Sequence, residues 1–153
     1  MTTPKPSDVE RAIFTPDFSA TLTRGERNNN PGNIVKSDIF WQGEITGADG
    51  RFETFQKPEY GIRAIARVVK NYAAKYGLNT VRGIINRYAP PVENNTNAYV
   101  AAVANELGVS PDTPLNLSDF NTLLALVTAI IRHENGRVAY SPSFLTYAVS
   151  LAA

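Results

Sequence analysis

One stretch near the C-terminal end constrains the fold more than any other. It predicts an apolar helix that carries a carboxylate in its last turn and ends directly after it. Residues 123–136 read L-L-A-L-V-T-A-I-I-R-H-E-N-G, and Asn135-Gly136 is a helix-stop signal. Glu134 falls within about 40° of the helix's apolar stripe. That stripe consists of Phe120, Leu123, Leu124, Val127, Ile130 and Ile131. The helix must therefore pack on a core and carry a carboxyl group toward it.

Two interpretations of Glu134 are open. At a fraying helix end, the side chain escapes to water. At a cleft, it stays half-buried, and both desolvation and the negative end of the helix dipole raise its pKa. A glutamic acid with a raised pKa can act as a general acid near neutral pH.

Composition narrows the function classes. The chain has 153 residues, with 43% hydrophobic and 19% charged, which is typical of one globular domain. A net charge of +1 argues against a nucleic-acid binder. Without cysteine and with His133 as its single histidine, the chain is expected to hold no metal and no cofactor. No apolar run predicts membrane insertion, and M-T-T-P-K-P-S at the N-terminus lacks the apolar region of a signal peptide.

The pattern along the chain predicts an α+β fold, predominantly α. Residues 1–20 form a tail with a short helix that starts at a capping box, Ser7 to Glu10, and residues 21–153 form one domain. Asp49-Gly50 predicts the turn of a small antiparallel hairpin within residues 35–55. About five helices follow. They are expected at 58–76, at 80–88 after an Asn79 cap, at about 96–107, from a cap at Asn116 or Ser118 to residue 134, and at 143–151.

An asparagine-rich loop precedes the hairpin. Arg24–Ile34 reads R-G-E-R-N-N-N-P-G-N-I, in which glycine and proline make a helix or strand improbable. Side-chain amides suit the hydroxyl and acetamido groups of sugars, and they equally suit the loop's own backbone. Both roles stay open for the four asparagines, which are Asn28, Asn29, Asn30 and Asn33.

The residues available for chemistry point to carboxylates. There is no thiol nucleophile, and no G-x-S-x-G turn supports a serine nucleophile with His133. Glycoside cleavage needs one carboxylic acid near the bridging oxygen. It also needs a second carboxylate or the acetamido group of the substrate. Trp41 in the hairpin either lines a sugar subsite or belongs to the core.

Four segments carry a family resemblance. R-G-E-R-N-N-N-P-G-N-I, F-E-T-F-Q-K-P-E-Y-G-I-R-A, I-I-N-R-Y-A-P-P-V-E-N-N-T-N-A-Y-V and A-I-I-R-H-E-N-G together resemble a family of phage and prophage proteins. Its members are described as virion structural proteins or as lysozyme-like peptidoglycan hydrolases. The resemblance covers residues 24–141, and it implies a lysozyme-like domain.

A second resemblance concerns mechanism. A-I-I-R-H-E-N-G-R-V-A-Y-S is similar to the end of the catalytic helix of lytic transglycosylases and glucosaminidases, and R-Y-A-P-P-V-E-N-N-T-N-A-Y-V-A-A-V is similar to the transglycosylase tyrosine segment. In those enzymes the glutamate helix comes first, whereas here it comes last, which suggests a circular permutation. The permutation requires Asn28–Asn33 to lie beside Glu134. The G-L-M-Q element of those enzymes is absent, and Pro90-Pro91 replaces N-A-G.

The resemblance implies roles for particular residues. Glu134 corresponds to the catalytic acid and Tyr88 to the cleft tyrosine, and the asparagines become candidates for a substrate-side loop. Glu26 is the rival acid, because an unpermuted lysozyme would carry its acid early in the chain.

Three further charged residues have open roles. Glu93 is either a second carboxylate in the substrate site or a partner of the next helix N-terminus. Arg132 and Arg137 flank Glu134 and would either lower its pKa or bind substrate carboxylates.

Two functions follow. The first is a glycosidase of muramidase or lytic-transglycosylase type that acts on peptidoglycan glycan strands. The second is a non-catalytic virion module that binds glycan or other virion proteins. In either case the protein is expected in the virion, or in the host cytoplasm before it acts on the periplasmic cell wall.

Overall fold

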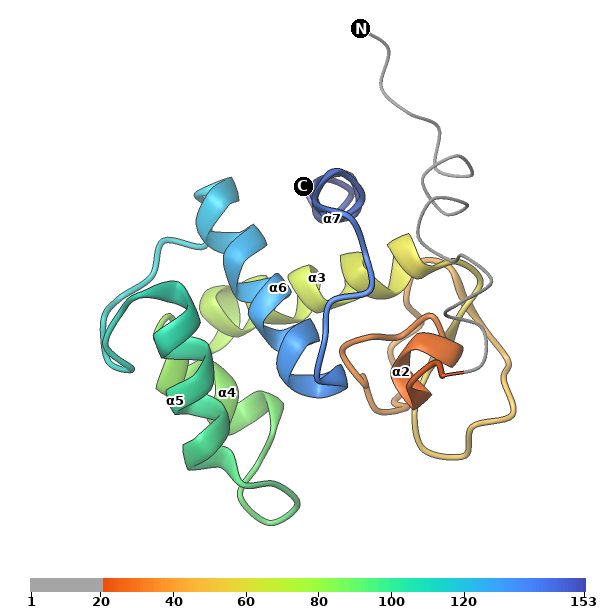
Figure 1. Ribbon diagram of the computed structural model, residues 1–153, viewed down its shortest axis with the longest axis horizontal. Helices are drawn as coiled ribbons and strands as arrows, with labels where there is room; N and C mark the ends of the chain where they lie inside the picture. The colour runs from red at the N-terminus through yellow and green to blue at the C-terminus, as the bar shows by residue number, and fades with distance from the viewer. Residues whose placement is uncertain (1–20) are drawn as a thin grey trace, which may run out of the picture.

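The structure, a computed structural model, describes residues 21–153 (Figure 1). These residues form α2 (Arg24–Arg27), β1 (Glu44–Ile45), β2 (Thr54–Phe55), α3 (Pro58–Tyr76), α4 (Val81–Tyr88), α5 (Thr96–Leu107), α6 (Phe120–Asn135) and α7 (Pro142–Ser150). The predicted fold class, α+β with helix predominating and a small antiparallel sheet, is confirmed. The tail and the helix predicted from Ser7 lie outside the described residues.

The core lies where α3, α6 and α7 pack together, and Figure 1 shows α6 crossing α3 near the middle of the molecule. The predicted stripe of α6 is buried at Leu123, Val127, Ile130 and Ile131, whereas Phe120 in the first turn is 37% exposed. Full burial of an aliphatic side chain contributes roughly 1.5–3 kcal/mol. The core therefore holds α6 firmly, and with it the position of Glu134 in the last turn.

The helix bounds agree with the sequence pattern, but two predicted caps are wrong. Thr80, not Asn79, caps α4, because its hydroxyl accepts from the backbone N–H of Gly83 at 3.1 Å. Asp119 caps α6 through Thr122 N–H at 3.0 Å. Both sites offered several cap-forming residues in a row, and the hydrogen bond to the third helical residue selects one of them. Gly136 ends α6 in the left-handed conformation, as expected.

The hairpin is short and closed by a carboxylate. β1 and β2 pair antiparallel, with Glu44 opposite Phe55 and Ile45 opposite Thr54. Between the strands, Asp49 Oδ1 accepts the backbone N–H groups of Arg51 and Phe52, each at 2.9 Å. The predicted turn at Asp49-Gly50 is thus held by the side chain of Asp49.

The asparagine-rich loop begins with a helix that the sequence argument excluded. α2 is one turn long and has a full capping box, in which Thr23 Oγ1 accepts from Glu26 N–H and Glu26 accepts from Thr23 N–H. The T-x-x-E signature at Thr23 to Glu26 could have predicted this turn, but the prediction rested on glycine and proline. Figure 1 shows α2 beside the last turn of α6, and the two helices are in contact.

Candidate functional site

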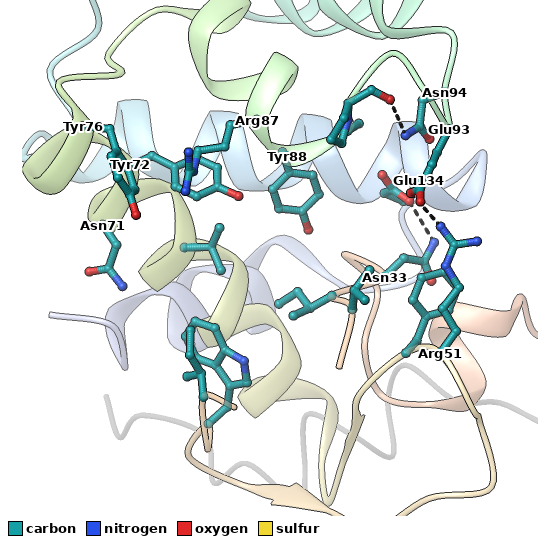
Figure 2. Close-up of a pocket in the computed structure, with 18 of the residues that line it drawn as sticks. Asn33, Arg51, Asn71, Tyr72, Tyr76, Arg87, Tyr88, Glu93, Asn94 and Glu134 are labelled. Carbon is teal, nitrogen blue, oxygen red and sulfur yellow. Dashed lines mark hydrogen bonds and ion pairs between the residues drawn. The ribbon is translucent and has the colours of Figure 1, made fainter. Parts of the chain in front are cut away.

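A cleft of about 460 Å³ crosses one face of the molecule, between the hairpin and helices α3 and α4 (Figure 2). Glu134 and Asn33 lie toward one end of it, and Tyr88 lies near its middle. The side chains of Tyr72, Tyr76 and others line the opposite end. The cleft thus has the elongated shape that an extended chain ligand needs.

Glu134 is held in this cleft by two neutral donors. Asn33 Nδ2 donates to Oε1 at 2.8 Å, and the Tyr99 hydroxyl donates to Oε2 at 2.9 Å. The carboxyl group is partly buried, and this burial raises the pKa of Glu134 above its ordinary value. The hydrogen bonds from Asn33 and Tyr99 and the charge of His133 act against that rise in pKa. Of the two interpretations of Glu134, the half-buried one is confirmed.

The loop and the end of α6 are joined by the next residue, Asn135. Its Oδ1 accepts from Thr23 Oγ1 at 2.6 Å, and its Nδ2 donates to the carbonyls of Pro31 and Ile131 at 2.7 and 2.8 Å. Together with the Asn33–Glu134 bond, these contacts bring residues about 100 positions apart into one site. The predicted closeness of Asn28–Asn33 to Glu134 is confirmed, and the circular permutation that suggested it stays a prediction.

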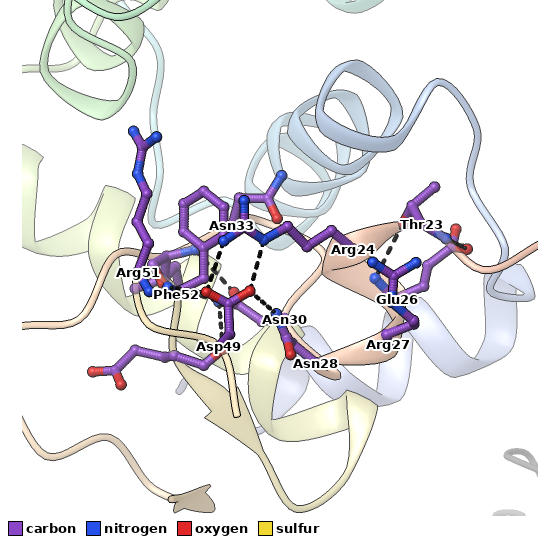
Figure 3. Close-up of polar contacts among 12 residues, drawn as sticks. Thr23, Arg24, Glu26, Arg27, Asn28, Asn30, Asn33, Asp49, Arg51 and Phe52 are labelled. Atoms are coloured by element: carbon purple, nitrogen blue, oxygen red, sulfur yellow. Dashed lines mark hydrogen bonds and ion pairs between the residues drawn. The ribbon is translucent and has the colours of Figure 1, made fainter. Parts of the chain in front are cut away.

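Only one of the four asparagines contacts the cleft carboxylate. Asn28 donates to Asp49 Oδ2 at 3.0 Å, and Asn29, in the left-handed conformation, donates to the carbonyl of Phe55 at 3.0 Å. Asn30 is fully buried and bonds the backbone of Ile34 and Glu53 (Figure 3). These three amides therefore hold the loop, and of the four asparagines only Asn33 lines the cleft, where its substrate-side role stays a prediction.

Glu26 lies outside the cleft lining, in a buried ion pair. Its side chain is 1% exposed, and Arg137 Nη2 and Nε donate to its two oxygens at 2.5 and 3.1 Å. The Thr23 N–H adds a third bond at 3.0 Å. The site geometry therefore favours Glu134 over Glu26 as an acid, and it gives Arg137 a structural partner instead of a substrate.

Tyr88 lines the cleft as predicted, but its hydroxyl is directed at the loop. It donates to the carbonyl of Gly32 at 2.6 Å, and burial raises the pKa of Tyr88 well above its ordinary value. A Cβ added to Gly32 would lie 2.3 Å from the Tyr88 hydroxyl oxygen. Glycine at position 32 thus permits the close approach of the loop to α4.

The remaining predicted site residues divide between the cleft and the surface. Trp41 is 8% exposed and belongs to the core, and it also lines the cleft, while its role in a sugar subsite stays a prediction. Glu93 also lines the cleft, where it pairs with Arg51 at 2.9 Å. Arg132 does not line it and pairs with Glu106 at 2.9 Å. The predicted role of Arg132 at the substrate is therefore corrected to a surface ion pair.

Two features of the site were missed in the sequence. No sequence signal showed that the hydroxyl of Tyr99 reaches Glu134 across 35 positions. Its ring also stacks on His133, with centroids 3.8 Å apart. Arg87, stacked over the rings of Tyr72 and Tyr76, was likewise not singled out.

The arrangement of the described residues supports proton transfer. Within residues 21–153, no group of three potential metal-ligating side chains comes together. No helix in the same range is both long and apolar enough to cross a membrane. A partly buried carboxyl group whose pKa is raised, set in an elongated cleft, can give a proton to a bound ligand and take one back.

Comparison with known proteins relates the chain to a bacteriophage protein. No family model matches it. Protein P5 of Pseudoalteromonas phage PM2 is 43% identical over 122 residues, which make up 77% of this chain and 74% of that protein. The chain therefore belongs to the family of the phage PM2 Protein P5.

Proposed function

We propose that the protein cleaves the glycan strands of peptidoglycan, with Glu134 as general acid and then as general base. The observation that carries the proposal is the state of this carboxyl group. It is partly buried in an elongated cleft, its pKa is raised by burial, and it is held by neutral donors with no cation paired to it in the described residues.

The hydrogen bonds suggest how the proton is carried. Oε1 accepts from the Asn33 amide, whose N–H group can only donate. The Tyr99 hydroxyl beside Oε2 can donate or accept. The proton is therefore placed on Oε2, from which it passes to the glycosidic oxygen as the bond to the leaving sugar breaks. The carboxylate then takes a proton from the incoming nucleophile, which is water in hydrolysis or a sugar hydroxyl in transglycosylation.

Among residues 21–153, one other carboxylate lines the cleft, and it already has an ion-pair partner. Glu93 pairs with Arg51, and both side chains are more than half exposed. A neutralised, solvated carboxylate stabilises a developing sugar cation poorly. The acetamido group of the substrate is therefore assigned the assisting role that a second carboxylate plays in other glycosidases.

The rival function is a non-catalytic phage structural protein whose cleft binds glycan or a virion protein. The family relationship favours it, because the relative is a phage protein whose name carries no activity. The site also allows it, since both oxygens of Glu134 have hydrogen-bond partners, as in a purely structural carboxyl group.

Digestion of purified peptidoglycan sacculi separates the two functions. Wild-type protein and Glu134→Gln, both shown to be folded by circular dichroism, are incubated with sacculi, and soluble fragments are identified by mass spectrometry. We expect the wild type to release fragments and Glu134→Gln to be slower by about 10²–10⁴-fold, the usual contribution of a general acid. Reducing ends would indicate hydrolysis, and anhydro ends would indicate transglycosylation.

Two outcomes would contradict the proposal. If folded wild-type protein sediments with sacculi but releases no fragments, the catalytic proposal fails and the binding function replaces it. If Glu134→Gln releases fragments as fast as the wild type, the cleavage is real and the assignment of Glu134 is wrong.

A further inference from the structure

The end of the cleft away from Glu134 has a chemistry of its own. Figure 2 shows Asn71, Tyr72, Tyr76 and Arg87 gathered there. Lys75, which directly precedes Tyr76 on α3, also lines the cleft. Two tyrosine rings, two cations and one amide therefore face a single region. None of these residues contacts Glu134, so the proton-transfer site does not account for them.

Arg87 is held in a way that leaves its hydrogen-bonding edge available. Its guanidinium carbon lies 3.8 Å from the ring centroid of Tyr76 and 5.4 Å from that of Tyr72. Stacking uses the face of a guanidinium group and fixes its plane. Stacking by the face leaves the N–H groups on the rim of the group able to bind a planar anion through two parallel bonds.

Within the described part of the chain, no carboxylate pairs with the cations at this end of the cleft. Among residues 21–153, no carboxylate lies within ion-pair distance of Arg87 or Lys75. The arginines elsewhere are different, since Arg51 at the Glu134 end pairs with Glu93, and Arg82 on the same helix pairs with Asp112. A stacked arginine beside an unpaired lysine in a cleft suits a carboxylate ligand.

We propose that this end of the cleft binds a carboxylate carried by the muramic acid substituent of the glycan strand. The inference rests on the proposed function, because it takes the glycan strand as the ligand. The sugar hydroxyl and acetamido groups are uncharged, so the negative charge of the strand comes from its substituents. The source is the stem peptide or, where the peptide has been removed, the lactyl group. Arg87 and Lys75 thereby place a substituted muramic acid away from Glu134 and set the direction of the strand in the cleft.

A binding measurement tests the subsite without relying on cleavage. The Glu134→Gln protein serves as the background, and its affinity is measured by calorimetry for three ligands: soluble peptide-bearing glycan fragments, the same fragments stripped by an amidase, and chitohexaose. We expect Arg87→Gln to weaken binding of peptide-bearing fragments by about three- to tenfold, and Lys75→Gln by about two- to threefold. Neither substitution should change the affinity for the uncharged chitohexaose.

Arg82→Gln is the matched control, because it removes the same charge from the same helix outside the cleft. It should leave all three affinities unchanged. Because amidase cleavage converts the lactyl amide into a carboxylate, stripped fragments that keep the dependence on Arg87 show that the subsite also takes the lactyl carboxylate. If they lose the dependence, only the stem peptide is the ligand. Raising the salt concentration should weaken binding of the charged fragments alone.

Three outcomes would overturn the subsite: no effect of Arg87→Gln, an equal loss for chitohexaose, or no fragment binding at millimolar concentration. Failure of the proposed function looks different. If Arg87-dependent binding is present but the wild type does not cleave sacculi, the carboxylate subsite stands and the catalytic role of Glu134 falls.

Discussion

Glu26 and Glu134 are both held at the junction of α2, its following loop and the end of α6, but their side chains have opposite surroundings. Each is fixed by contacts with residues far away in the sequence, and each accepts bonds on both of its oxygens. Glu26 faces the guanidinium group of Arg137 and has a side chain only 1% exposed. Glu134 faces an amide and a phenol and opens into the cleft.

The difference in hydrogen-bond partners separates a carboxylate with a structural role from one suited to proton transfer. A buried carboxylate that is paired with a cation keeps its charge and fastens two segments together. A carboxyl group that is desolvated beside neutral donors holds its proton more readily, and burial raises the pKa of Glu134 for this reason. Burial alone would have selected Glu26, whereas the absence of a cationic partner in the described residues selects Glu134.

The largest stability effect is expected at Glu26. Replacing it by glutamine leaves the Arg137 charge without its carboxylate and weakens the link between α2 and the segment after α6. We expect a loss of about 2–3 kcal/mol in the free energy of unfolding. That is somewhat below the ~3–5 kcal/mol for a fully buried pair, because Arg137 is one-third exposed. Urea denaturation measures this loss directly.

Glu106→Gln provides the control, since it breaks the surface pair with Arg132. An exposed pair contributes about 0–1 kcal/mol, so the control should lose much less stability than Glu26→Gln. Equal losses in the two variants would show that the Glu26–Arg137 pair does not fasten the loop.

A smaller and pH-dependent effect is expected at Glu134. Because its pKa is raised in the folded protein, the protonated carboxyl favours folding below the pKa of the unfolded chain. This advantage is lost as the pH rises through the folded pKa. Glutamine does not titrate in this range. The melting temperature of Glu134→Gln minus that of the wild type should therefore increase between pH 4 and pH 8.

Calorimetric scans across this pH range measure the difference between the two proteins. A difference that stays flat, or that shrinks as the pH rises, would contradict the raised pKa of Glu134.

The smallest change is expected from Tyr99→Phe. The hydrogen bond from the Tyr99 hydroxyl lowers the pKa of Glu134, so removing it should raise that pKa further. The alkaline limb of the pH profile of glycan cleavage should then move to higher pH, with a stability loss of about 0.5–1.5 kcal/mol. Tyr88→Phe also removes one buried hydroxyl, but that hydroxyl bonds Gly32, so this limb should stay in place.

Much of the fold followed from local signals. The helix at Pro58–Tyr76 was predicted with its observed bounds, because its apolar spacing and flanking residues agree. The turn at Asp49 and the end of α6 at Gly136 were likewise predictable, because each depends on a single residue with a strong backbone preference. The closeness of Asn33 to Glu134 came from a family resemblance instead of from any local pattern.

The rest of the site depends on distant partners that no local pattern contains. Asn28 and Asn33 look alike in the sequence, yet one bonds Asp49 in the hairpin and the other bonds Glu134 on α6. Glu26 and Arg137 read as a loop acid and a helix-flanking base until the fold joins them across 111 positions. Side-chain roles were therefore predicted less well than helices, because each role depends on what packs against the residue.

The most direct test of the account compares the initial rates of peptidoglycan solubilisation by Glu134→Gln and Glu26→Gln. Both are measured at a temperature where each variant is fully folded. The account predicts that Glu134→Gln loses about 10²–10⁴-fold in rate, while Glu26→Gln stays within about threefold of the wild type. A Glu134→Gln rate equal to that of the wild type, or a loss confined to Glu26→Gln, would contradict it.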